Sequence, residues 1–163
     1  MFHRQHIDVY VLDVRLPVQL LQSLVQVFKG DTTILTLVGG LDYLDAHLLE
    51  NVTYRDWDHS GGDRAAEIPL TRKNVHILVE SILPHVGVRR NVYEVTIEDV
   101  DSDRRKILFK AYDNFDRWPG IEGTYNKGAV VTSRIDVQVL DDLVAKQVIR
   151  KYLVHDTPDT DWD

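Results

Sequence analysis

Hydrophobic and polar residues alternate most regularly between Val92 and Phe115, on either side of a turn at 101–103. Pairing Val100 with Arg104 gathers the apolar side chains of both halves on one face. The expected partners are Tyr93 and Ala111, Val95 and Phe109, Ile97 and Ile107, Glu94 and Lys110, Thr96 and Leu108, and Glu98 and Lys106. Opposite charges then meet on the second face, and a slip of one residue would turn the apolar face towards water. The pattern therefore predicts an antiparallel hairpin in this register.

Further strands are predicted from alternating or short apolar runs, and helices from apolar residues repeated every three or four positions. Short apolar or alternating runs predict strands at 6–15, 32–38, 52–57 and 129–139. Apolar residues at helical spacing predict helices at 17–29, at 41–51, after Thr71 as far as Pro84, and from Asp141 to Lys151. Pro17 suits a first helical position, Thr71 suits an N-cap, and residues 58–66 are expected to form a polar loop.

Together these elements predict an α+β (or mixed α/β) fold. We expect a single sheet of about five strands, antiparallel in its C-terminal part, with three to four helices packed on it. Residues 1–154 are expected to form a single globular domain and residues 155–163 an acidic C-terminal tail. The pattern leaves the strand order and the oligomeric state open.

The charge of the chain narrows the classes of partner. The 163 residues include 26 acidic and 19 basic side chains, which gives a formal net charge of −7. Nucleic acids demand a basic surface, so we expect no nucleic-acid partner. An excess of acids suits a basic protein partner or a cation, although it also serves solubility alone.

Hydropathy and cysteine content indicate the compartment. No apolar run reaches the roughly 18 residues that a membrane helix requires, so no membrane partner is expected. The first six residues, MFHRQH, lack the apolar segment of a secretion signal. The chain has no cysteine, which excludes disulfides and thiolate chemistry and fits a cytoplasmic protein.

One loop has the spacing of a cation site. Residues 56–67 resemble the calcium loop of the EF-hand family, with candidate ligands at Asp56, Asp58, Ser60, the carbonyl of Gly62, and Glu67. The resemblance implies short oxygen ligands at alternate positions, a glycine at the sharp bend and a longer carboxylate that closes the cage. Calcium is thus a possible cofactor, and a solvated acidic turn is the alternative interpretation.

Motifs for catalysis are weak. None of the five serines lies in a nucleophile elbow, and Gly39-Gly40 lacks the spacing of a phosphate-binding loop. We therefore assign no catalytic residue and expect a non-enzymatic protein, while an enzyme with a site assembled from distant residues remains an alternative.

The remaining pattern is aromatic residues set among acids in predicted loops. The members are Tyr54, Asp56, Trp57, Asp58, Asp113, Phe115, Asp116, Trp118, Glu122 and Tyr125. Tryptophan and tyrosine are enriched in binding hot spots, and acids set partner choice and association rate. The sequence thus predicts a module that docks a basic protein, as an immunity-type inhibitor of a cationic toxin does. Alternatively, the tryptophans of these loops cover the core.

Overall fold

The computed structural model describes residues 6–39, 41, 44, 46–56, 64–85, 92–101, 104–112 and 128–158. Its strands are β1 (His6–Val14), β2 (Thr33–Gly39), β3 (Thr53–Asp56), β4 (Arg64–Pro69), β5 (Val92–Asp101), β6 (Arg104–Tyr112), β7 (Gly128–Thr132) and β8 (Ile149–Pro158). Its α-helices are α1 (Pro17–Val27), α2 (Arg72–Ile77) and α3 (Val137–Ala145). A short 3-10 turn spans Ala46–Leu48, and α2 continues through a π turn at Leu78–Ile82 and a 3-10 turn at Leu83–His85.

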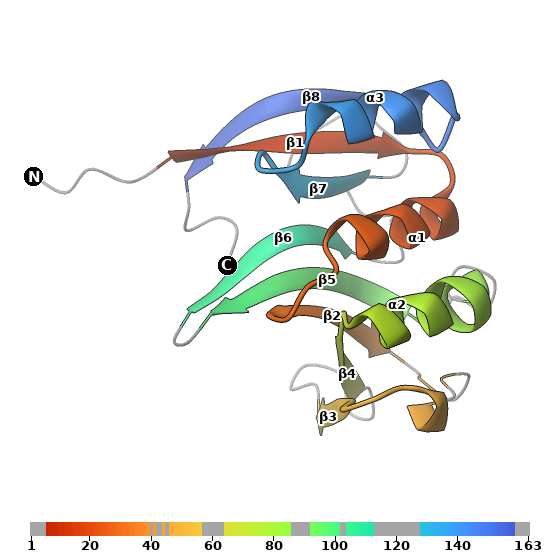
Figure 1. Cartoon of the computed structure of the whole chain (residues 1–163). Coiled ribbons are helices and arrows are strands. Elements are labelled where there is room, and N and C mark those ends of the chain that lie inside the picture. Colours follow the sequence, from red (N-terminus) through yellow and green to blue (C-terminus); the bar gives the residue numbers. More distant parts are fainter. Residues whose placement is uncertain are drawn as a thin grey trace, which may run out of the picture.

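All the described strands belong to one sheet with the order β3-β4-β2-β5-β6-β7-β1-β8, and every neighbouring pair is antiparallel. The sheet is strongly twisted, and α1, α2 and α3 lie on one side of it (Figure 1). The N-terminal strand β1 lies between β7 and β8, so the two ends of the chain are joined in one half of the sheet.

The expected sheet of about five strands is wrong, because the sheet has eight strands and carries three α-helices in the described part. The first half of strand β4 lies within the predicted polar loop, where Ala65 and Ala66 are fully buried. Strand β8 begins where the final helix was expected to continue. The expected helix at 41–51 is reduced, among its described residues, to the turn Ala46–Leu48.

The predicted last strand at 129–139 forms only as far as Thr132, where β7 ends, and its continuation is wrong because α3 begins at Val137. Asp136 caps this helix by accepting a hydrogen bond from the backbone N–H of Gln138 (2.9 Å). The helix ends at Ala145, and Gln147 then takes a left-handed backbone conformation with φ 59°. That conformation ends the helix and turns the chain into β8.

The central hairpin forms, but its predicted register is wrong. Asp101 pairs with Arg104, so the connection has two residues, and a β-bulge interrupts the pairing between Ile97 and Glu98. Past the bulge, Val95 lies opposite Ala111 and Ile97 opposite Phe109 in place of the expected partners, which are shifted by two residues. The two-residue connection shifts the pairing by one residue and the bulge shifts it by one more. Past the bulge the total shift of two keeps the apolar side chains on their common face, so the hydrophobic pattern alone did not reveal it.

The core lies between the sheet and the helices. Its largest fully buried side chains include Phe109 and Leu12 from the sheet, Leu24 from α1 and Leu78 from the π turn. The side chain of Gln22 on α1 donates to the carbonyl of Val79 (2.9 Å), which ties α1 to the π turn. Both groups are partly buried, so this bond satisfies a carbonyl that would otherwise be costly to bury.

Strand β8 continues through Pro158, beyond residue 155 where the acidic tail was expected to begin. Residues 159–163 lie outside the described part of the chain. None of the described helices has the length and apolar character needed to span a membrane.

Candidate functional site

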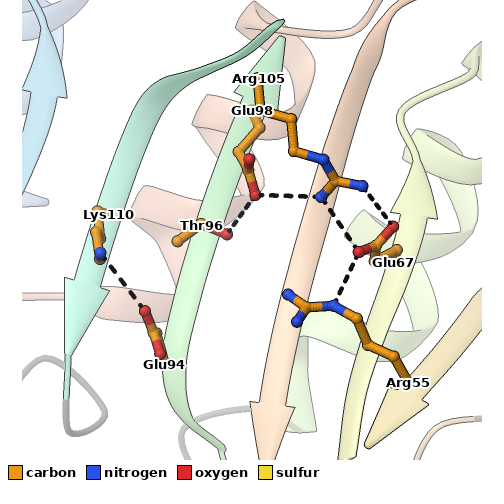
Figure 2. A network of polar contacts seen from close by, with 7 residues as sticks. All are labelled: Arg55, Glu67, Glu94, Thr96, Glu98, Arg105 and Lys110. Carbon is orange, nitrogen blue, oxygen red and sulfur yellow. Dashed lines mark hydrogen bonds and ion pairs between the residues drawn. The ribbon is translucent and has the colours of Figure 1, made fainter. Parts of the chain in front are cut away.

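A row of polar side chains crosses the sheet on the face that points away from the helices. Glu67 on β4, Thr36 on β2, Thr96 on β5 and Lys110 on β6 are successive cross-strand partners. Figure 2 shows Glu67, Thr96 and Lys110 in front of the ribbon, with the helices behind it. Because cross-strand partners share a face of the sheet, the strand order alone brings these four residues into line.

Glu67 is the centre of this row, and two arginines hold its carboxylate. Arg105 donates to both oxygens, Nη1 to Oε1 and Nη2 to Oε2 (3.2 Å each), and Arg55 Nε donates to Oε1 (3.0 Å). Burial of the carboxyl raises its pKa, but the bonds and positive charges of Arg105 and Arg55 outweigh burial and leave the pKa of Glu67 below its ordinary value. The same carboxylate raises the pKa of Arg105, against the opposing effect of burial.

Two further ion pairs extend the row along β5. Lys110 Nζ lies 3.7 Å from Glu94 Oε1, and Arg105 Nη1 lies 3.8 Å from Glu98 Oε1. The Thr96 hydroxyl donates to Glu98 over 3.5 Å. The positive and negative side chains of the row are paired with one another, so the row is suited to holding strands β3 to β6 together across β2. It offers neither an activated nucleophile nor a free base.

One polar atom in the row lacks a protein partner. The hydroxyl of Thr36 is buried and makes no hydrogen bond, although Thr36 lies directly between Glu67 and Thr96. Burying an unpaired hydroxyl costs about 1–3 kcal/mol, which the paired charges around it must offset.

The predicted calcium ligands are divided between described and undescribed residues. Asp56 ends β3, where it lies opposite Arg64, and Glu67 lies opposite Thr53, three residues along the same ladder. Both oxygens of Glu67 already accept hydrogen bonds from guanidinium groups. Asp58, Ser60 and Gly62 lie outside the described residues. No group of three or more potential ligands that could hold a metal occurs in the described part of the chain, and the calcium loop stays a prediction.

The predicted partner-binding residues are divided in the same way. Tyr54 and Asp56 are exposed on β3, and the guanidinium of Arg64 lies over the Tyr54 ring, 4.8 Å from its centroid. The others lie outside the described residues: Trp57, Asp58, Asp113, Phe115, Asp116, Trp118, Glu122 and Tyr125. Their placement on a surface or against the core therefore stays a prediction.

The strand directions nevertheless fix where the two aromatic loops begin and end. Segment 57–63 leaves β3 at Asp56 and enters β4 at Arg64, and segment 113–127 leaves β6 at Tyr112 and enters β7 at Gly128. Because neighbouring strands are antiparallel throughout, all four of these strand ends lie at the same end of the sheet. The segments that follow Gly39 of β2 and precede Val92 of β5 join the sheet at this end too. We call it the loop end.

The acidity of the chain is concentrated outside the strands and helices. The described residues contain 14 basic and 15 acidic side chains, a net charge of −1. The chain as a whole carries −7, so the remaining segments carry −6. The sheet and its helices are thus almost neutral, and the connecting segments and termini provide nearly all the negative charge.

Sequence reasoning missed both arginines of the row. Arg105 lies on β6, and its contact with Glu67 on β4 crosses the two strands between them, β5 and β2. No local motif indicates such an arrangement, since it depends on the strand order.

No protein-family model matches this chain, and no curated protein or solved structure matches it closely enough to assign a family or a function.

Proposed function

We propose that this protein is a non-enzymatic binding module that docks a basic protein partner through the loop end of its sheet. One observation carries the proposal: the two acidic, aromatic segments, 57–63 and 113–127, connect to strand ends at the same end of the sheet. Cytoplasmic location is part of the proposal, as is an inhibitory role of the immunity type towards a cationic toxin.

The spacing of the two segments suits a protein interface. Four strand spacings separate β3 from β6, which corresponds to about 19 Å. A standard interface buries about 800 Å² on each partner, a patch on the order of 30 Å across. Each spacing also turns the sheet by roughly 20–25°, so the loop end curves between the two segments. A partner that meets both segments therefore follows a twisted edge.

Charge supports a basic partner. Within the two segments, Asp58, Asp63, Asp113, Asp116 and Glu122 outnumber Arg117 and Lys127. Acids around aromatic anchors speed encounter with a positively charged surface and exclude acidic partners. Association by this route weakens as ionic strength rises, because salt screens charges separated by more than about 10 Å.

The test begins with capture of partners by the full chain, followed by titration of the captured protein against variants. Trp57→Ala and Trp118→Ala should each weaken binding at least tenfold while leaving the unfolding midpoint almost unchanged. Asp56→Asn at the loop end should slow association, and Asp101→Asn, an exposed acid at the opposite end, is the matched control.

Two results contradict the proposal. If either tryptophan variant loses its cooperative unfolding, that side chain belongs to the core and not to an interface. If the captured protein is acidic, or if Asp101→Asn slows association as much as Asp56→Asn does, charge at the loop end does not select the partner.

A further inference from the structure

The two edges of the sheet differ in a way that points to self-association. Strand β3, at one edge, has four residues and includes Arg55 and Asp56. Strand β8, at the other edge, has ten residues and runs along the margin of the sheet in Figure 1. Its centre exposes Leu153 by 50% and Val154 by 61%, the two highest values among the large apolar side chains described.

Natural edge strands are normally kept short or charged, because their free N–H and C=O groups recruit further strands. Strand β3 follows that rule and the middle of β8 does not. The outer side of β8 has no partner strand among the described residues, and its two central residues are accessible in the folded chain. A long edge strand with accessible apolar residues at its centre indicates a surface that is normally covered there.

We propose that a second copy of this chain covers it, with the two β8 strands paired antiparallel about a two-fold axis. Such an axis must stand perpendicular to the joined sheet, because only that orientation makes neighbouring strands antiparallel. Residues on the same face then pair, so the sum of two paired residue numbers is even. We place the axis at Leu153, which faces Leu153 of the second copy.

This register is self-complementary. Tyr152 lies opposite Val154 of the second copy, and an aromatic paired with a β-branched residue is a favourable cross-strand combination. Arg150, whose Nη1 also donates to Asp13 of its own chain (3.1 Å), lies opposite Asp156 of the second copy, since the basic residues precede the centre of β8 and the acidic residue follows it. Moving the axis to Val154 would instead place Leu153 against His155 and Tyr152 against Asp156, which loses both matches.

The dimer would place the helices of both copies on the same side of one continuous sheet and direct the two loop ends in opposite directions. It therefore leaves the proposed partner surface of each copy accessible, and it stands or fails independently of that function. A contact made chiefly by one strand from each copy is smaller than a standard interface, so we expect dimerisation to depend on concentration in the micromolar range.

Light scattering across a concentration series tests the association. The mass of the native chain should rise from 18.8 kDa towards twice that value as its concentration increases. Leu153→Lys and Val154→Lys should each remain monomeric at every concentration, with unfolding midpoints close to the native one because both side chains are exposed. Leu48→Lys, which alters another exposed leucine far from β8, should dimerise as the native chain does. A native chain that stays monomeric, or a dimer that both β8 variants keep, overturns the proposal.

A cysteine tests the register, since the chain has none of its own. Leu153→Cys should form a disulfide-linked dimer under mild oxidation, because its two copies face each other at the axis within reach of a disulfide. Val154→Cys should cross-link several times more slowly, since its two copies are offset along the strands. Equal rates, or faster cross-linking at residue 154, would rule out the register centred on Leu153.

Discussion

Replacing Glu67 with glutamine tests whether the polar row holds the sheet together. The variant keeps the size of the side chain but removes the charge that binds Arg105 and Arg55. A hydrogen bond to a charged group contributes about 1.5–3 kcal/mol. The two arginine side chains are 47% and 49% exposed, so water replaces part of what they lose. We therefore expect Glu67→Gln to lower the free energy of unfolding by about 1–2 kcal/mol, and the melting temperature by about 2–8 °C.

The matched control is Glu50→Gln. Glu50 pairs with Lys73 at 3.1 Å, but both side chains are largely exposed, so its loss should cost less than about 0.5 kcal/mol. Urea unfolding at neutral pH followed by far-ultraviolet circular dichroism measures both variants. If Glu67→Gln costs no more unfolding free energy than Glu50→Gln, the bonds of the two arginines to the largely buried Glu67 carboxylate do not stabilise the fold, and the reasoning is refuted.

Acid provides an independent check on the same carboxylate. Because the folded protein lowers the pKa of Glu67 below 4.5, the carboxylate contributes its stabilisation fully above the unfolded pKa. That contribution is lost as the pH falls through the lower, folded value. The difference in unfolding free energy between the native chain and Glu67→Gln should therefore be largest near neutral pH and should shrink below about pH 4. A difference that stays constant down to about pH 3 would contradict this assignment.

Two further predictions concern other parts of the molecule. Asn74 is fully buried, accepts from the N–H of Glu50 (2.8 Å) and donates to the carbonyls of Glu50 and Pro69 (2.9 Å each). Asn74→Ala should therefore lower the free energy of unfolding in urea by about 2–4 kcal/mol. A loss under about 1 kcal/mol would show that the 46–50 segment does not depend on Asn74. Calcium in millimolar excess over EDTA should leave the melting temperature unchanged, because Glu67 is occupied by arginines and lies three residues along the ladder from Asp56. A filled site at a hundred times its dissociation constant would stabilise by about 2.7 kcal/mol, so a rise of several degrees would support the calcium interpretation.

The sequence predicts well those features whose cause is local. Pro17 begins α1 as expected, and the Thr71 hydroxyl caps α2 by accepting from the N–H of Asn74 (3.2 Å). The strand at 6–15 and the two strands of the central hairpin occur close to their predicted bounds. The fixed backbone angle of Pro17, the capping oxygen of Thr71 and the alternation along the strands each act within a few residues, so the sequence alone reveals them.

Features that depend on distant partners escaped prediction. Strand β4 looks polar in sequence because Arg64 is exposed and Glu67 lies on the face away from the helices, while the fully buried Ala65 and Ala66 have only small side chains. The end of α3 carries no glycine, since Gln147 takes the left-handed position instead, and helical spacing therefore seemed to continue into β8. The same holds for the candidate site. The acidic and aromatic composition of its loops can be seen in the sequence, but only the strand order shows that both loops join the same end of the sheet.

The position of β1 in the sheet has a consequence for synthesis of the chain. Strand β1 ends at Val14, but its neighbours begin at Gly128 and Ile149, so it cannot pair with them until those much later residues have been made. At about 5–20 residues per second, a ribosome needs on the order of ten seconds to make the intervening segment. During that delay Val9, Val11 and Leu12, all buried in the finished protein, remain without their partners. Strand β1 is thus made long before the strands that pair with it, and premature aggregation of the nascent chain is the hazard that this topology creates.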